Sequence, residues 1–141
     1  MSHLKFYTPP GVPESMLESH HYSQAVRVGD LIQLSGQAGI DFSTGEWPSG
    51  IDGQVDEAFI NVDKCLKFAG GKGWEQVFKV NSYHIPLSEE MMAAMIRNFR
   101  KWMPNHRPLW TCIEVPRLGE KGMIVEIEVQ AHDPEGAEKT K

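Results

Sequence analysis

The chain has 141 residues, which suits a single domain with a core of its own. Hydrophobic residues make up 40% of the sequence and charged residues 23%, which is typical of a globular protein and excludes a disordered one. The net charge of −5 and the lack of any Lys/Arg cluster argue against nucleic-acid binding.

The sequence shows no sign of a membrane segment, a secretion signal or a metal site. No apolar run approaches the length of a membrane span, and the N-terminus lacks the apolar core of a secretory signal. Cys65 and Cys112 stand alone, without CxxC or Cys/His spacing, so we expect no metal and no cofactor. A reducing compartment, the cytoplasm, is the expected location, and a short mitochondrial transit peptide stays open.

In chain order, the sequence predicts an N-terminal arm, one folded domain and a polar tail. Residues 1–19 hold three prolines and little periodicity, so we expect an arm laid over the surface rather than a packed element. The domain spans residues 20–132. The tail, residues 133–141, is polar, and we expect it to be flexible.

The first half of the domain predicts a hairpin and a helix. The segments AVRV and LIQLS flank Gly29-Asp30, which is a typical two-residue hairpin turn. Apolar residues at helical spacing follow, with Asp52 as the expected N-cap and Gly70-Gly71 as the expected end.

The second half predicts strand, helix, strand, strand. Residues 75–85 are rich in β-forming residues, and a second amphipathic helix lies between Ser88 as its cap and Pro104 as its end. Strands are expected at 109–115 and 123–131. The order ββαβαββ predicts an α+β fold, with one mixed sheet and both helices on one face.

The other face of this sheet is expected to be half polar and half apolar. Alternation in the last strand directs Glu126 and Glu128 away from the helices, and we expect Trp110 of the preceding strand on the same side. The expected members of this face are Gln33, Ser35, Trp110, Cys112, Glu114, Glu126 and Glu128. Such a face is either solvated or packed on a second copy of the chain. A carboxylate in a junction of copies would have a raised pKa, which suits proton transfer.

Two blocks of the sequence carry a family resemblance. HYSQAVRVGDLIQLSGQ, residues 21–37, resembles the opening block of the Rid family, the reactive intermediate deaminases, also called the YjgF or L-PSP endoribonuclease family. CIEVPRLGEKGMIVEIE, residues 112–128, resembles its closing block. The resemblance covers about residues 20–132. It implies a chorismate mutase-like fold whose subunits form a homotrimer through the free sheet faces, with a small-molecule cleft at each junction.

The resemblance also implies site residues. In deaminating members an Arg binds the carboxylate of a 2-imino acid, and a Glu helps water to add to the C=N carbon. Glu126 matches that Glu, and Tyr22, Ser35 and Cys112 match further cleft positions. Trp110 stands where the family has the Arg, and a Trp cannot offer the charged, bidentate fork of a guanidinium.

The missing Arg leaves several functions open. Arg107 or Arg117 could anchor a substrate in its place. The first hypothesis is a hydrolase of imine or enamine C–N bonds that is not a standard 2-imino acid deaminase. The alternative is a non-catalytic trimer that binds a small metabolite. The third, an endoribonuclease, is disfavoured by the acidic charge.

Overall fold

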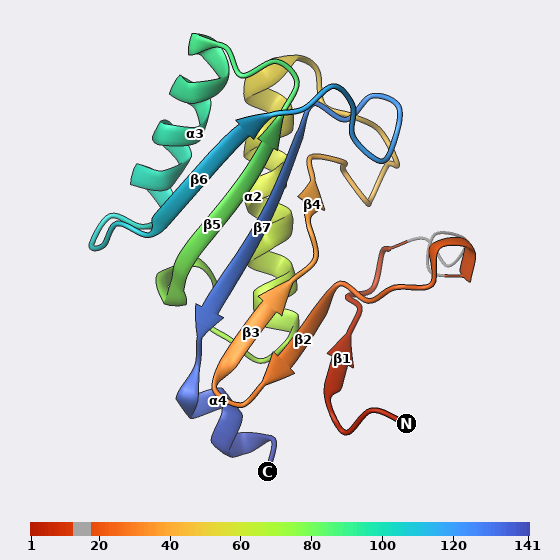
Figure 1. Cartoon of the computed structure of the whole chain (residues 1–141), viewed down its shortest axis with the longest axis vertical. Helices are drawn as coiled ribbons and strands as arrows, with labels where there is room; N and C mark the ends of the chain where they lie inside the picture. Colours follow the sequence, from red (N-terminus) through yellow and green to blue (C-terminus); the bar gives the residue numbers. More distant parts are fainter. Residues whose placement is uncertain (13–17) are drawn as a thin grey trace.

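The structure, a computed structural model that describes residues 1–12 and 18–141, contains one seven-stranded sheet (Figure 1). The strand order is β1-β2-β3-β7-β5-β6, and β4 also pairs with β7. Strands β5 and β6 run parallel and the other pairs antiparallel, so the sheet is mixed, as predicted. The strands are β1 (Lys5–Tyr7), β2 (Ala25–Val28), β3 (Leu31–Leu34), β4 (Gln37–Ala38), β5 (Val77–His84), β6 (Leu109–Glu114) and β7 (Val125–His132).

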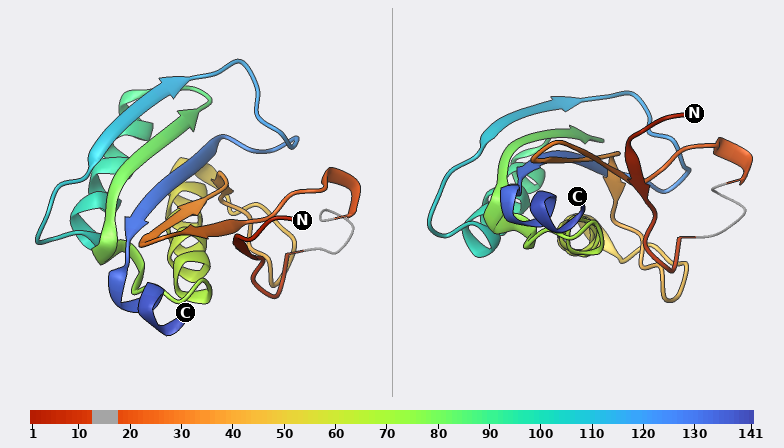
Figure 2. Two further views of the ribbon diagram at one scale, coloured as in Figure 1. Left: turned by 60° about the horizontal axis from the view of Figure 1, so that its bottom comes forward. Right: turned by 90° about the horizontal axis from the view of Figure 1, so that it is seen from below.

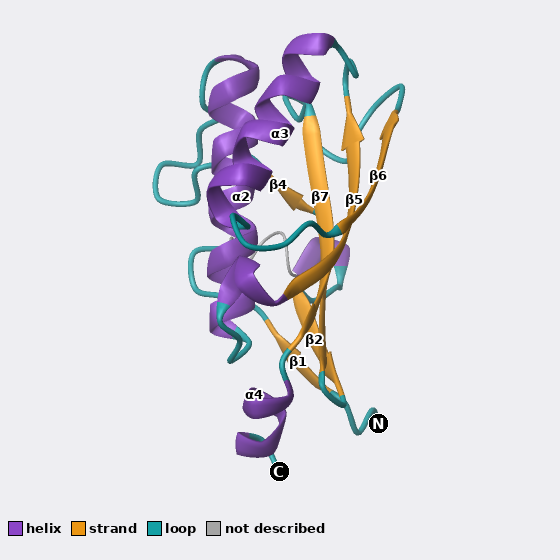
Figure 3. Ribbon diagram, turned by 90° about the vertical axis from the view of Figure 1, so that its left-hand side faces the viewer, coloured by secondary structure: helices purple, strands orange, loops and turns teal. Residues whose placement is uncertain are grey.

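The two long helices and the C-terminal helix lie on one side of the sheet (Figure 3). They are α2 (Gly50–Phe68), α3 (Glu89–Trp102) and α4 (Pro134–Lys139), and a 3-10 helix, η1 (Gly73–Gln76), leads into β5. Figure 2 shows that the opposite face of the curved sheet carries none of these helices. The α+β architecture with two main helices on one face is therefore confirmed. Among the residues that the structure describes, no helix has both the length and the apolar character to cross a membrane.

Local signals in the sequence explain where several elements begin and end. Gly29 has a φ of +58° in the turn between β2 and β3, a conformation that glycine adopts without strain. The Ser88 hydroxyl accepts a hydrogen bond from the backbone N–H of Met91 at 3.1 Å, so it caps α3 as predicted. Helix α2 begins two residues before Asp52, with Ser49 at the cap position, so the predicted Asp52 cap is wrong.

The core lies between the sheet and the two long helices. Phe59 of α2 stacks on Trp74 with ring centroids 4.6 Å apart, and the Trp74 Nε1–H donates to the Phe59 carbonyl at 2.9 Å. Val125 and Ile127 of β7 are fully buried against this layer. The buried alternation of β7 fixes which side chains of that strand must face away from the helices.

The described parts of both ends of the chain contain a regular element. Lys5–Tyr7 form β1, which pairs with β2, while residues 13–17 of the expected arm lie outside the described residues. The expected flexible tail forms α4. Asp133 at its start is buried and pairs with the buried Arg27 of β2, with Nη2 and Oδ2 2.8 Å apart.

Candidate functional site

The glutamates of β7 lie on the sheet face opposite the helices, as predicted. Glu126 and Glu128 are half-buried and alternate with fully or almost fully buried residues. Glu128 is held by its neighbours on β5, since the Tyr83 hydroxyl and the Asn81 side-chain amide both donate to its Oε1. The contact with Glu128 raises the pKa of Tyr83 to about 12, so Tyr83 stays a hydrogen-bond donor at neutral pH.

Glu126 has a different environment. Burial raises the pKa of its carboxyl, and the negative charge of Glu128 raises that pKa further. Gly36 lies directly against it, because a Cβ at position 36 would collide with the Glu126 carboxyl group. The absence of a side chain at Gly36 therefore makes room for the carboxyl, and its raised pKa makes Glu126 a better base than an exposed carboxylate.

Glu126 lies where two hollows of the surface meet. The first has a volume of about 270 Å³ and is also lined by Tyr22. The second has a volume of about 730 Å³ and is also lined by Arg117. The loop residues 119–121 border both hollows. The structure therefore brings three of the predicted site residues, Tyr22, Arg117 and Glu126, to one place.

Ser35 lines neither of the two hollows that contain Glu126. Its hydroxyl donates to the Ser23 carbonyl at 2.7 Å, so it is committed to the backbone. It borders a third hollow, which it shares with Tyr22 and not with Glu126.

The first hollow includes residues that the sequence pattern did not indicate. Phe42 and Trp47 line it, and they come from the irregular segment before α2. A segment without strand or helix periodicity gives no information about which way its side chains point. The one feature of the sequence that could have indicated them is their type, because large aromatic side chains are unusual in a loop, where most residues are polar and solvated.

Trp110 and Cys112 lie on the other face, so the predicted orientation of β6 is wrong. The Trp110 ring meets Phe99 of α3 edge-on, with centroids 4.8 Å apart, and the Cys112 sulfur lies 3.9 Å from that of Met92. Leu109 and Ile113 are 67% and 46% exposed. Strand β6 therefore directs its aliphatic residues away from the helices.

The reason is the position of β6 in the sheet. It is an edge strand, parallel to β5, and Trp110 pairs with Val80, which faces the helices. Neighbouring residues in a ladder point to the same face, so Trp110 must face the helices too. Glu114 follows the same alternation, and its carboxylate accepts the Leu87 N–H at 3.0 Å.

The indole N–H of Trp110 is already in use. It donates to the Ser82 hydroxyl at 2.9 Å, and the same oxygen lies 2.8 Å from Nε2 of His84. Burial lowers the pKa of His84 to about 4, so this ring is neutral at pH 7. Trp110 consequently presents only its ring to a ligand.

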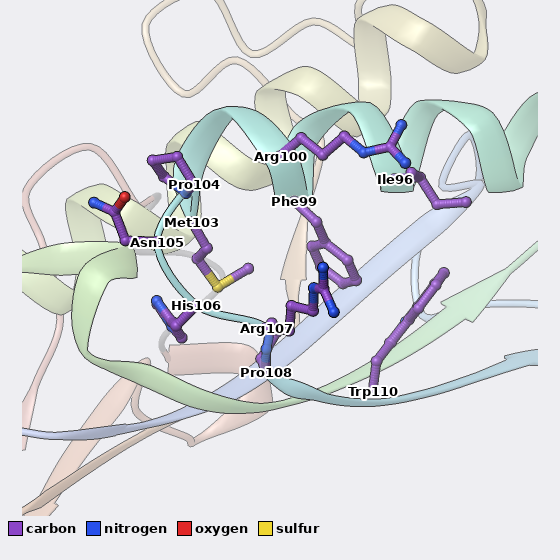
Figure 4. A pocket seen from close by; sticks show the side chains of 10 residues that line it. All are labelled: Ile96, Phe99, Arg100, Met103, Pro104, Asn105, His106, Arg107, Pro108 and Trp110. Atoms are coloured by element: carbon purple, nitrogen blue, oxygen red, sulfur yellow. The ribbon is translucent and has the colours of Figure 1, made fainter.

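Arg107 lies on the helix side as well. Figure 4 shows its side chain directed from the loop before β6 toward the space between Phe99 and Trp110. Within the chain, the sheet thus separates Arg107, Trp110 and Cys112 from Glu126, whereas Arg117 lines a hollow together with Glu126.

Within residues 1–12 and 18–141, no group of three or more His, Cys, Asp or Glu side chains is arranged to hold a metal ion.

Comparison with known proteins decides the family. The family model described as "Endoribonuclease L-PSP" matches residues 13–133. The chain therefore belongs to the endoribonuclease L-PSP family. This is the same family, the Rid family, that the sequence blocks 21–37 and 112–128 resemble. The RutC family protein YjgH of Escherichia coli (strain K12) is 31% identical over 126 residues, which cover 89% of this chain and 93% of that protein.

Other members agree with the L-PSP assignment. A solved structure titled "Structural Genomics, Protein YJGH" has a TM-score of 0.79 and 29% identity, and the match covers 95% of this chain and 99% of that chain. The 2-iminobutanoate/2-iminopropanoate deaminase of Escherichia coli (strain K12) is 29% identical over 113 residues, which cover 78% of this chain and 85% of that protein. The fold is consistent with the chorismate mutase-like fold that the resemblance implies.

Proposed function

We propose that this L-PSP family chain is a hydrolase that adds water to the C=N carbon of a small imine or enamine-type metabolite and releases ammonia. The observation that carries the proposal is the Glu126 carboxyl, half-buried and unpaired among the described residues, with a raised pKa, at the junction of two hollows. The deaminase name of one relative supports the reaction class. The free thiols of both cysteines suit the cytoplasm as the compartment.

The chemistry requires one group that moves a proton twice. The substrate reacts as the iminium ion, whose nitrogen already carries the extra proton. As a water oxygen bonds to the C=N carbon, the Glu126 carboxylate takes one water proton, and the C=N electron pair becomes the lone pair of a neutral amine nitrogen. The protonated Glu126 then returns its proton to that nitrogen. The C–N bond breaks, ammonia leaves with the bonding electron pair, and the C=O bond of the product forms as the hydroxyl proton passes to the Glu126 carboxylate and from there to water. An enamine enters the same sequence after protonation at carbon.

A homotrimer through the open sheet face is part of this proposal. Exposed Leu109 and Ile113 share that face with the glutamates, which is unusual for a face that stays in water. A second copy would cover these aliphatic residues and bury Glu126 further. In such a trimer, the cleft that contains Glu126 of one subunit would be lined, from the β6 edge of a neighbouring subunit, by Trp110, Cys112 and Arg107.

The substrate is proposed to differ from the small 2-imino acids in the relative's name. A carboxylate that enters a partly desolvated site needs a charged partner, and Trp110 offers no charge and no free N–H. Loss of such a contact costs about 2–5 kcal/mol, which is about a 30- to 5,000-fold loss. An imine with an apolar or aromatic body fits better, and Arg117, which lines one hollow together with Glu126, is proposed as its anchor.

The test is ammonia release from imines generated in situ. 2-Imino acids come from amino acids and an amino-acid oxidase, and imines without a carboxylate come from amines and a flavin amine oxidase. We expect acceleration over the uncatalysed rate for imines with apolar bodies and little for 2-iminopropanoate. Trp110→Arg is expected to raise the rate with 2-iminopropanoate. If no imine is accelerated, the hydrolase proposal is wrong, and a non-catalytic binding trimer takes its place.

A further inference from the structure

The smaller hollow at Glu126 has an aromatic wall that the proposed proton transfers do not use. Phe42 and Trp47 line it from the segment between β4 and α2, and Met123 lines it from the loop before β7. Phe42 and Trp47 are half-buried, whereas residues 43–46 between them are exposed. The volume of about 270 Å³ lies just below the range of about 300–1,000 Å³ that is usual for small-molecule pockets, so the hollow suits a molecule with a single ring.

The segment that carries the two aromatic residues is held in place before any ligand binds. The side-chain amide of the buried Asn61 on α2 donates to the carbonyls of Ala38 and Ile40, each at 2.8 Å. The Asp41 N–H donates to the Glu46 carbonyl at 3.0 Å, which closes the turn between the two aromatic residues. An aromatic wall that is fixed in this way loses little entropy when it binds a flat ring.

The loop before β7 is fixed against the same wall, and Figure 1 shows it beside the segment before α2. The Gln54 side chain of α2 donates to the Gly122 carbonyl at 2.9 Å and accepts the Ile124 N–H at 3.3 Å. The Trp47 ring lies directly against Gly122, because a Cβ at position 122 would be 2.9 Å from the indole nitrogen. Trp47 and this loop therefore form one continuous wall of the hollow.

The charges around the hollow favour a cation. Of the formally charged side chains that the structure describes, Glu120, Glu126 and Lys121 line it, so carboxylates outnumber ammonium groups there. Glu128 adds negative charge one step along the same face of β7. The iminium ion of the proposed reaction is a cation, and a carboxylate beside it provides a charge-assisted contact.

We propose that this hollow selects imines with a single aromatic ring, and that Phe42 and Trp47 are the residues that determine this specificity. The ring packs against the two aromatic side chains, and the iminium group lies beside the Glu126 carboxylate. This narrows the apolar or aromatic body of the proposed substrate to one ring. The inference rests on the proposed function for the fate of the iminium group, whereas binding of the ring is measured without hydrolysis.

The first test measures binding of benzamidine by isothermal titration calorimetry and by the indole N–H signals in ¹H–¹⁵N NMR spectra. Benzamidine is a stable planar cation with one ring, so it stands in for the iminium ion of benzaldehyde. Acetamidine keeps the charge without the ring, and benzamide keeps the ring without the charge. We expect benzamidine to shift the Trp47 indole signal, and each of the other two compounds to bind about tenfold or more weakly.

Variants test whether benzamidine binds at this wall and not elsewhere on the chain. Trp47→Leu and Phe42→Leu should each weaken benzamidine binding about tenfold and leave acetamidine binding unchanged, and Phe42→Leu keeps the contact between Trp47 and Gly122. Phe68→Leu is the matched control, because Phe68 is 47% exposed at the end of α2 and does not line the hollow. It should leave benzamidine binding unchanged.

The second test is ammonia release from the imines that a flavin amine oxidase makes from benzylamine and from propylamine. Trp47→Leu should lower kcat/KM about tenfold for the benzylamine product and change it little for the propylamine product. If neither imine is hydrolysed but benzamidine binds as expected, the hydrolase proposal fails and the aromatic wall stands as a binding site. The inference is overturned if benzamidine does not bind at millimolar concentration, if acetamidine binds as tightly, or if Trp47→Leu and Phe68→Leu have equal effects.

Discussion

At the scale of single residues, the pKa of Glu126 follows from where β7 places it. The strand alternation sends Glu126 to the open face, the missing side chain of Gly36 lets it lie against the backbone, and Glu128 follows one step along. Burial and a like charge both disfavour the ionised form, so both raise the Glu126 pKa.

The first prediction concerns this pKa. In ¹³C NMR titrations of side-chain carboxyls, Glu126 should titrate above the ordinary value of 4.5. Glu128→Gln removes a negative neighbour, which favours the Glu126 carboxylate, so the midpoint should move to lower pH. The prediction is contradicted if Glu126 titrates like an exposed carboxylate, or if its midpoint is the same in Glu128→Gln as in the unchanged protein.

The second prediction concerns His84 and acid stability. Burial lowers its pKa from 6.5 to about 4, so between these values the unfolded chain binds a proton that the folded chain does not. The stability contributed by the neutral ring is fully present above pH 6.5 and is lost as the pH falls toward 4. The size is up to about 3 kcal/mol at about 1.4 kcal/mol for each pH unit.

Urea unfolding at several pH values checks this. The free energy of unfolding of His84→Gln should fall less steeply between pH 6.5 and 4 than that of the unchanged protein. Because both proteins share all other titrating groups, the difference isolates His84. Parallel pH dependences of the two proteins would show that His84 is not kept neutral by the fold.

At the scale of elements, the C-terminal helix is attached through one buried ion pair. Arg27 on β2 contacts the Asp133 carboxylate, the Asp133 carbonyl and the Ala69 carbonyl, which links β2, α2 and α4. Asp133 also accepts from the Gly136 N–H and so caps α4. Removing one partner of a buried pair leaves an uncompensated charge.

The third prediction is that Asp133→Ala lowers the free energy of unfolding by about 3–5 kcal/mol. Glu135→Ala is the control on the same helix. Glu135 pairs with Lys72 at the surface, where both side chains are more than half exposed and water screens the pair, so its removal should cost far less than that of Asp133. Chemical denaturation measures both. Equal costs for the two variants would mean that the Arg27–Asp133 pair does not hold α4 in place.

Elements also show what could be predicted from the sequence. The β2–β3 hairpin and the Ser88 cap of α3 were predictable because they depend on residues a few positions apart. The orientation of β6 was not, because it depends on its register with β5 and on its place at the edge of the sheet. The attachment of α4 was missed for the same reason, since Arg27 and Asp133 are 106 positions apart. The glutamate positions were predictable because the strict alternation of β7 needs no knowledge of neighbours.

At the scale of the whole molecule, the face without helices determines how the chain is expected to assemble. The fourth prediction is a homotrimer, with a mass in sedimentation equilibrium about three times the 15.9 kDa of the chain. Ile113→Glu places a charge in the proposed interface and should shift the mass toward that of a monomer, because an unpaired interfacial charge is costly.

Ile96→Glu is the matched control for the trimer. Ile96 is also exposed but lies on α3, away from the open sheet face, so this variant should keep the trimer mass. If the unchanged protein is a stable monomer at micromolar concentration, the predicted trimer is wrong, and so are the clefts proposed between its subunits.

The measurement that tests the central proposal most directly is kcat/KM for ammonia release from the best imine, compared between Glu126→Gln and Glu128→Gln. Each variant removes one carboxylate from the same face of β7 and keeps a side chain of nearly the same size at that position. If Glu126 moves the proton, Glu126→Gln lowers kcat/KM by about 10²- to 10⁴-fold, whereas Glu128→Gln has a far smaller effect. Unchanged turnover by Glu126→Gln, or equal losses in the two variants, would contradict the role proposed for Glu126.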